Sequence, residues 1–233
     1  MSGLKRNYYG TAEKLLVAVD CIIFGFDEKE IKLLLFKRKF EPFKGRWSLV
    51  GGFVGENEDV DQAASRILKD YVGLENIFLQ QLKGYGKADR DPGGRVVSFA
   101  FSALIPLKHH EIEIVESYQA HWFSQDEIPN LILDHNEMLQ DAIENLRIKA
   151  QRQPIGFELL PEKFTLPQLK TLYDNIYQTN LDSRNFRKKI LSLNVLKKLD
   201  EKDKSGSKKG AFLYQFDAEK YEKMVKSGFD FQI

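Results

Sequence analysis

The chain has a single cysteine, Cys21, among its 233 residues, which excludes an internal disulfide and a cysteine metal site. Long apolar runs are also missing. Stretches such as 15-LLVAV-19 and 21-CIIFGF-26 are far shorter than a membrane span, and the N-terminus lacks an export signal. The four histidines show no H-x-x-H or H-E-x-x-H spacing, and the pair His109–His110 is expected in a loop. We therefore expect a cytoplasmic protein without a cofactor or a histidine metal site.

The net charge of +1 hides an uneven distribution of charge along the chain. Residues 1–150 carry 19 Lys and Arg against 23 Asp and Glu, a net charge of −4, whereas residues 151–233 carry 16 against 11, a net charge of +5. The segment 151-QRQPIG-156 lies between them, and its proline and glycine are typical of a linker. We predict two domains, residues 1–150 and residues 156–233, and the basic second domain has the charge to face a polyanion.

The first domain has the pattern of a mixed α/β fold. From Asp59 to Tyr71 the apolar residues recur at steps of three and four, which predicts an amphipathic helix that ends at Gly73. A second helix is expected over residues 134–150. The β-rich segments predicted as strands are residues 15–26, 31–38, 77–84, 95–105 and 120–123.

The stretch from Trp47 to Leu74 resembles the motif of the Nudix hydrolase family. That motif runs Gly, five residues, Glu, seven residues, Arg-Glu-aliphatic, one residue, Glu-Glu, one residue, Gly-aliphatic. The residues that match it in register are Gly52, Glu58, Arg66, Leu68, Gly73 and Leu74. The resemblance implies an α/β/α sandwich with a mixed sheet.

The departures from this motif fall on the residues that carry its chemistry. Nudix enzymes cleave diphosphates with divalent cations held mainly by glutamates of the motif helix, and hard cations need several oxygen ligands. The three glutamate positions hold Ile67, Asp70 and Tyr71, of which only Asp70 is a carboxylate. We expect no catalytic residues, no metal site and no hydrolysis, with Glu58 and Arg66 kept as a structural pair. The alternative is a relocated ligand set drawn from Glu56, Asp59 and Asp61.

The second domain has the order of a winged helix–turn–helix: two helices and then a basic hairpin. Thr165 and Gln168 form a predicted capping box for the first helix, and Asp182 is the N-cap candidate for the second. In this design the second helix enters the DNA major groove and the hairpin contacts the backbone. Over residues 182–209, ten Lys and Arg face four Asp and Glu. The predicted DNA-binding residues are Arg184, Asn185, Arg187, Lys188, Lys189, Lys204, Lys208 and Lys209.

The pairing of a degenerate Nudix domain with this C-terminal texture resembles the Nudix-related transcriptional regulators. That resemblance covers nearly the whole chain and implies a sensor of a small effector, either an ADP-ribose-like nucleotide or a pentose such as L-arabinose. The textures 18-AVDCIIFGF-26 and 97-VSFAFSALIPL-107 look more like the sugar-responsive branch. The predicted effector-binding residues are Asp20, Lys44, Arg46, Glu56, Asp89 and Arg95, chosen as cations for a phosphate or as mixed donors and acceptors for a sugar.

The leading hypothesis is therefore a ligand-responsive repressor that acts as a homodimer on a palindromic double-stranded DNA operator. A second hypothesis is an active hydrolase of nucleoside diphosphate sugars with a nucleic-acid-binding tail. A protein-interaction module is a third, and a solvated lysine-rich surface is the bland explanation of the basic hairpin.

Overall fold

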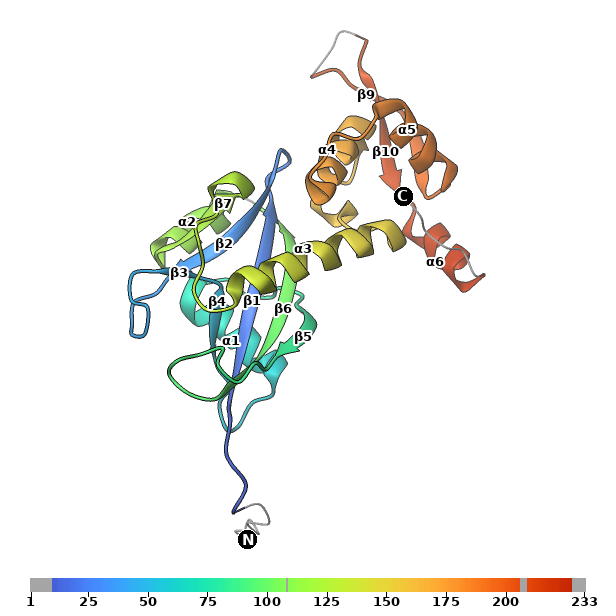
Figure 1. Cartoon of the computed structure of the whole chain (residues 1–233). Helices are drawn as coiled ribbons and strands as arrows, with labels where there is room; N and C mark the ends of the chain where they lie inside the picture. The colour runs from blue at the N-terminus through green and yellow to red at the C-terminus, as the bar shows by residue number, and fades with distance from the viewer. Residues whose placement is uncertain (1–9, 108, 206–208, 228–233) are drawn as a thin grey trace, which may run out of the picture.

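The computed structural model describes residues 10–107, 109–205 and 209–227, and its first domain is built on one mixed sheet (Figure 1). β1 (Leu16–Phe26) pairs in parallel with β6 (Val96–Pro106) along the full length of both strands. The other pairings are antiparallel, in the order β3-β2-β1-β6-β5 with β4 beside β1 and β7 beside β2. The remaining strands are β2 (Ile31–Lys37), β3 (Trp47–Ser48), β4 (Val50–Phe53), β5 (Gln80–Tyr85) and β7 (Ala120–Ser124).

Helices cover both faces of this sheet, because successive residues of β1 point to opposite sides. Val19 and Cys21 belong to a core shared with α1 and α2, whereas Ile22 and Phe24 belong to a second core shared with α3. The predicted α/β/α sandwich is confirmed. Its helices are α1 (Val60–Val72), α2 (His109–Ser117) and α3 (His135–Arg152), and none of the described helices is long and apolar enough to cross a membrane.

Helix α1 begins and ends at the residues that the sequence predicts. The side chain of Asp59 accepts a hydrogen bond from the backbone N–H of Gln62, and the side chain of Gln62 accepts one from the backbone N–H of Asp59. Gly73 takes a left-handed conformation with φ of 70° and donates its N–H to the carbonyl of Lys69. These signals lie within one turn of the helix ends, which is why they can be recognised without tertiary information.

Two sequence predictions for this domain are wrong. The pair His109–His110 begins α2 instead of lying in a loop. The cause is that Ile112 and Ile114 alternate with acids, a spacing that does not mark a helix. The strand predicted from residue 77 begins only at Gln80, and Phe78 before it is 87% exposed.

The second domain is a winged helix, as predicted. Its three-stranded sheet has the order β8-β10-β9, and β9 and β10 form the hairpin, or wing. Thr165 and Gln168 make the predicted capping box of α4, and Asp182 caps α5. The elements are β8 (Phe164–Thr165), α4 (Leu166–Tyr177), α5 (Ser183–Ser192), β9 (Leu196–Asp203), β10 (Ala211–Phe216) and α6 (Ala218–Lys226).

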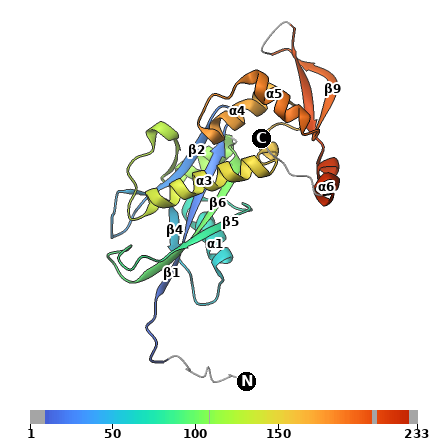
Figure 2. The ribbon, with the colours of Figure 1, turned by 45° about the vertical axis from the view of Figure 1, so that its right-hand side comes forward.

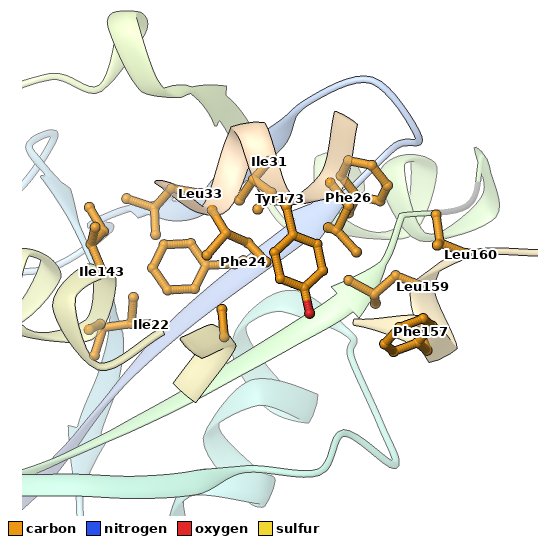
Figure 3. Close-up of a cluster of buried hydrophobic side chains, with 14 of the residues drawn as sticks. Ile22, Phe24, Phe26, Ile31, Leu33, Ile143, Phe157, Leu159, Leu160 and Tyr173 are labelled. Carbon is orange, nitrogen blue, oxygen red and sulfur yellow. The ribbon is translucent and has the colours of Figure 1, made fainter. Parts of the chain in front are cut away.

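One continuous core joins the two domains (Figure 3). Tyr173 of α4 is fully buried in the same cluster as Phe24 and Leu33 of the Nudix sheet. Short 3-10 turns flank α3, at Gln125–Glu127 before it and at Phe157–Leu159 after it. Both ribbon views show α3 running from the sheet toward the winged helix, with α5 and the wing on the far side of α4 (Figures 1 and 2). The shared core gives the first domain a physical contact through which it can affect the second.

Candidate effector site and nucleic-acid interface

The first domain contains a cavity of about 370 Å³ between the Nudix motif and the strand pair β1–β6. Its volume falls at the lower end of the range of about 300–1,000 Å³ that is usual for small-molecule sites. It is lined by Leu16, Ala18, Asp20, Arg38, Phe40, Glu41, Pro42, Phe43, Leu49, Gly51, Gly52, Phe53, Tyr71, Arg90, Asp91, Gly93, Val96, Leu133 and His135.

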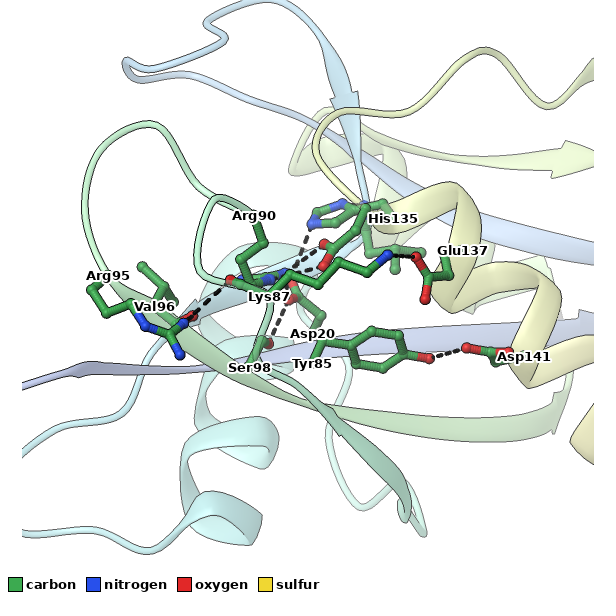
Figure 4. Close-up of polar contacts among 12 residues, drawn as sticks. Asp20, Tyr85, Lys87, Arg90, Arg95, Val96, Ser98, His135, Glu137 and Asp141 are labelled. Carbon is green, nitrogen blue, oxygen red and sulfur yellow. Dashed lines mark hydrogen bonds and ion pairs between the residues drawn. The ribbon is translucent and has the colours of Figure 1, made fainter.

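A buried polar cluster forms part of the cavity wall (Figure 4). Ser98 donates its hydroxyl to Asp20 Oδ2 at 2.6 Å, and Arg90 Nη2 lies 3.6 Å from the same oxygen. Arg90 also donates two hydrogen bonds to Asp134, at 2.9 and 2.7 Å. Burial by itself lowers the pKa of Arg90, but the hydrogen bonds that it donates to Asp134 and the charge of Asp20 outweigh this effect, so the pKa is raised. The arginine is therefore a fixed cation that compensates two buried carboxylates.

His135, the first residue of α3, completes this cluster. The backbone N–H of Leu49 donates to His135 Nδ1 at 3.1 Å, so the neutral ring carries its proton on Nε2. Nε2 lies 3.5 Å from Asp20 Oδ1. Burial lowers the pKa of His135, and the nearby charge of Asp20 offsets this only in part. The imidazole is a neutral donor held against the carboxylate.

The Glu58–Arg66 pair between the Nudix loop and helix α1 is formed as the sequence predicts. Arg66 donates from Nε to Glu58 Oε2 at 2.8 Å and from Nη2 to Glu58 Oε1 at 2.6 Å. The Gly55 N–H donates to the same carboxylate at 2.6 Å. The Arg66 hydrogen bonds, helped by Gly55, lower the pKa of Glu58 to about 2. This pair ties the loop after β4 to the middle of α1.

Two of the three positions that hold glutamates in the Nudix motif serve packing in this chain. Ile67 is fully buried in the core below the sheet, and Asp70 is exposed with Arg66 Nη1 at 3.8 Å. Tyr71 stacks on Phe36, with ring centroids 5.5 Å apart and 21° between the planes. Among the residues that the structure describes, no group of three or more His, Cys, Asp or Glu is arranged to hold a metal ion.

Of the six predicted effector-binding residues, the structure places Asp20 on the cavity. The other five are exposed and do not line it. Arg38, Arg90, Asp91 and Tyr71 line it instead. No sequence pattern marks His135 or Ser98, because each acts through partners far away in the chain. The five predicted residues outside the lining are Lys44, Arg46, Glu56, Asp89 and Arg95.

Helix α5 presents the predicted DNA-binding side chains on one exposed face. Phe186 and Ile190 anchor the opposite face in the core. Among the described residues no ion pair engages the cations of the exposed face, which leaves their charges available to a polyanion. The exposed residues are Arg184, Asn185, Arg187, Lys188 and Lys189, and the first four border a shallow surface hollow together with Leu191.

The wing carries further exposed cations near its tip. Lys204 and Lys209 are exposed, whereas the predicted residue Lys208 lies outside the described residues. Lys198 and Lys202 lie over the ring of Phe212, with their Nζ atoms 3.7 and 4.4 Å from its centroid. The wing and α5 therefore add their positive charge to one end of the molecule.

Comparison with known families matches each domain separately. Residues 14–143 match the NUDIX domain, and residues 156–216 match the domain described as NrtR DNA-binding winged helix domain. A relative from Acinetobacter baylyi, the ADPR responsive transcriptional repressor NtrR, is 32% identical over 211 residues, which cover 89% of this chain and 84% of that protein. An ADP-ribose pyrophosphatase from Methanocaldococcus jannaschii is 38% identical over 126 residues, covering 54% of this chain and 71% of that enzyme.

Solved structures give the same relationship. Shewanella oneidensis NrtR complexed with a 27mer DNA has a TM-score of 0.71 and 25% identity, covering 92% of this chain and 97% of that one. The NUDIX domain of the same protein complexed with ADP ribose has a TM-score of 0.53 and 29% identity, covering 60% of this chain and 94% of that one. The chain therefore belongs to the Nudix family and, through both of its domains, to the NrtR group of Nudix-related transcriptional regulators.

Proposed function

We propose that this chain is a DNA-binding transcriptional repressor whose Nudix domain binds a small effector without hydrolysing it. The observation that carries the proposal is the exposed cationic face of α5, since a second helix of this kind is the one that enters the major groove in helix–turn–helix proteins. The packing of Ile67 and Tyr71 where the motif has glutamates supports the absence of hydrolysis. The Shewanella relative was solved with DNA, and the Acinetobacter relative is named as an ADPR responsive repressor, which supports DNA binding and a response to a small effector.

The effector that we propose is an ADP-ribose-type nucleotide. The sequence favoured L-arabinose or a related pentose, but the relatives described above are named for ADP-ribose, and they give the pentose no support. We keep the pentose as an outcome of the test. In this proposal the protein acts as a homodimer on a palindromic operator, because two-fold symmetry in the protein matches two half-sites in the DNA. It acts in the cytoplasm.

The test is a fluorescence-anisotropy titration of labelled promoter DNA from the source genome. Selective binding of some promoters over a shuffled duplex supports the repressor, and loss of that binding on addition of ADP-ribose supports the effector. The variant Arg187→Ala/Lys188→Ala should lose affinity, whereas Lys69→Ala, which removes a cation from the Nudix surface, should not. Equal affinity for all duplexes would contradict the proposed repressor function. Release of the DNA by L-arabinose but not by ADP-ribose would contradict the proposed nucleotide effector.

An active hydrolase is the second candidate, and the 38% identity to an ADP-ribose pyrophosphatase is the observation that favours it. Incubation of the purified chain with ADP-ribose and Mg²⁺ or Mn²⁺ separates the two. We expect no AMP above the background without protein, because hard cations need several oxygen ligands and neither Ile67 nor Tyr71 carries a carboxylate. Turnover that Glu56→Gln or Asp61→Asn abolishes would establish relocated metal ligands instead.

A further inference from the structure

An aromatic wall lines the side of the cavity next to the Nudix helix. Tyr71 stacks on Phe36, and the ring of Phe40 lies against Tyr71 with centroids 6.4 Å apart and 60° between the planes. The guanidinium carbon of Arg38 lies 4.5 Å from the centroid of Phe40. Tyr71, Phe40 and Arg38 all line the cavity, so this wall offers ring surface with one cation at its end.

The buried cluster around Asp20 gives the cavity a polar part. The Asp20 side chain is 8% exposed and accepts one hydrogen bond, from Ser98, so its carboxylate retains lone pairs for hydroxyl donors. His135 holds its Nε2 proton beside it. Such a pair can bind sugar hydroxyl groups, which donate to a carboxylate and accept from an N–H group.

The charges on the lining limit where a phosphate can lie. The cavity is lined by two arginines and by the carboxylates of Asp20, Glu41 and Asp91. Arg90 already compensates Asp134 and Asp20, so Arg38 is the lining cation that a phosphate can use. An anionic group is therefore favoured beside Phe40 and disfavoured next to Asp20.

We propose that Tyr71 and Phe40 form the ring-binding wall of the effector site, so that the cavity selects a nucleotide with a planar heteroaromatic ring and a ribose over a free pentose. The ring packs on the aromatic wall, a ribose hydroxyl reaches Asp20, and a phosphate lies near Arg38. A free pentose can satisfy the polar part but leaves the apolar ring surface of Phe40 in contact with water. This inference rests on the proposed function, since it assigns a specificity to the proposed effector site.

Tyr71 occupies a position that holds a glutamate in the Nudix motif, so the motif helix has a different role in this chain. A Cβ on Gly52 would lie 3.0 Å from Ile67 Cδ1 and 3.7 Å from the Tyr71 hydroxyl, so these two side chains fill the space beneath the Gly52 backbone. The position that supplies a metal ligand in the hydrolase motif supplies a ring in this chain. Exchange of a metal ligand for a ring replaces catalysis on the diphosphate with recognition of the group attached to it.

The experiment is isothermal titration calorimetry of the full chain with ADP-ribose and with ribose 5-phosphate, which keeps the sugar and a phosphate but lacks the ring. Tyr71→Ala and Phe40→Ala should each weaken ADP-ribose binding about 10- to 100-fold, the range expected for loss of one stacked ring. Ribose 5-phosphate binding should stay as it is in the wild type. Tyr71→Phe, which keeps the ring, should bind ADP-ribose as the wild type does.

The design separates binding from folding and from the proposed function. Phe40 is 43% exposed, so Phe40→Ala remains informative if Tyr71→Ala fails to fold, and Phe78→Ala removes an exposed aromatic outside this cavity as the matched control. An equal loss for both ligands, or full affinity in Phe40→Ala and Tyr71→Ala, would overturn the ring-binding wall and leave the effector assignment intact. A wild-type chain that binds ribose 5-phosphate or L-arabinose but not ADP-ribose would overturn both.

Discussion

The side chain of Asn175 in α4 accepts a hydrogen bond from the backbone N–H of Ile31 at 3.0 Å, although the two residues belong to different domains. The same amide donates from Nδ2 to the carbonyl of Lys29 at 2.9 Å, so Asn175 pairs with the start of β2 much as a neighbouring strand would. β2 leads on toward Arg38 in the cavity wall, and α4 packs on α5 through the ring pair Tyr173–Phe186, with centroids 5.7 Å apart. The cavity of the first domain and the cationic face of α5 are therefore connected by a continuous series of contacts.

Replacement of Asn175 by alanine tests this connection. The variant leaves the N–H of Ile31, a residue that is 3% exposed, without its partner, which should cost about 1–3 kcal/mol in the free energy of unfolding. Urea denaturation followed by circular dichroism measures it. Asn180→Ala is the matched control, because Asn180 is exposed and accepts only from Lys170. Equal stabilities of the two variants would contradict a structural role for the interdomain amide.

The Glu58–Arg66 pair predicts a dependence of stability on acid. The pKa of Glu58 falls from an ordinary 4.5 to about 2 in the folded chain, so the unfolded chain binds more protons between these values. The stabilisation is complete above pH 4.5 and is lost as the pH falls toward 2. The wild type should therefore lose its stability advantage over Glu58→Gln across this window. Glu56→Gln, an exposed change in the same loop, is the matched control. A wild-type advantage over Glu58→Gln that does not change across this window would refute the pairing.

Arg90 is the residue of the cavity whose loss should damage the fold most. Its side chain is 2% exposed and compensates Asp134 and Asp20, both nearly buried, so Arg90→Met removes the cation that these two carboxylates share and leaves Asp20 with the neutral groups of Ser98 and His135. The cost should be about 3–5 kcal/mol, seen as a lower midpoint of thermal or urea unfolding. Arg95→Met removes an exposed arginine of the same turn and should change stability by less than about 0.5 kcal/mol. Similar effects of the two changes would rule out the buried ionic cluster.

The two parts of the basic end should respond differently to substitution if the proposed DNA contact is right. Arg184→Ala on α5 should weaken the free energy of DNA binding by about 1–3 kcal/mol and reduce the preference for one operator sequence. Lys209→Ala on the wing should weaken all duplexes alike and reduce the slope of log affinity against log salt by about 1. Anisotropy titrations at several salt concentrations distinguish these results, and a sequence-independent loss for Arg184→Ala would place α5 on the backbone instead of the bases.

Several features were predictable from the sequence because they depend on residues close together in the chain. The N-cap Asp59, the stop at Gly73 and the pair Glu58–Arg66 lie within about four helix turns of one another, and the stop and the pair form as predicted. The same is true of the N-cap Asp182 on α5. Helix periodicity and capping depend on residues within a short segment, so they can be recognised from the sequence of that segment alone. The resemblance to the Nudix motif and to the Nudix-related regulators, in contrast, indicated the two domains and the departures at the glutamate positions.

The set of residues around the cavity was decided only by the tertiary structure. Asp20, Ser98 and His135 meet because β1 and β6 pair in parallel with Asp20 opposite Ala100, and because α3 begins against Leu49. Lys44 and Arg46 were predicted because they lie near the Nudix motif in the sequence. The position of a cationic residue along the chain does not determine whether its side chain lines a cavity. Strand register and the packing of α3 do, since both depend on contacts between residues far apart in sequence. For the same reason the ring wall of Tyr71 and Phe40 and the amide of Asn175 became visible only in the folded chain.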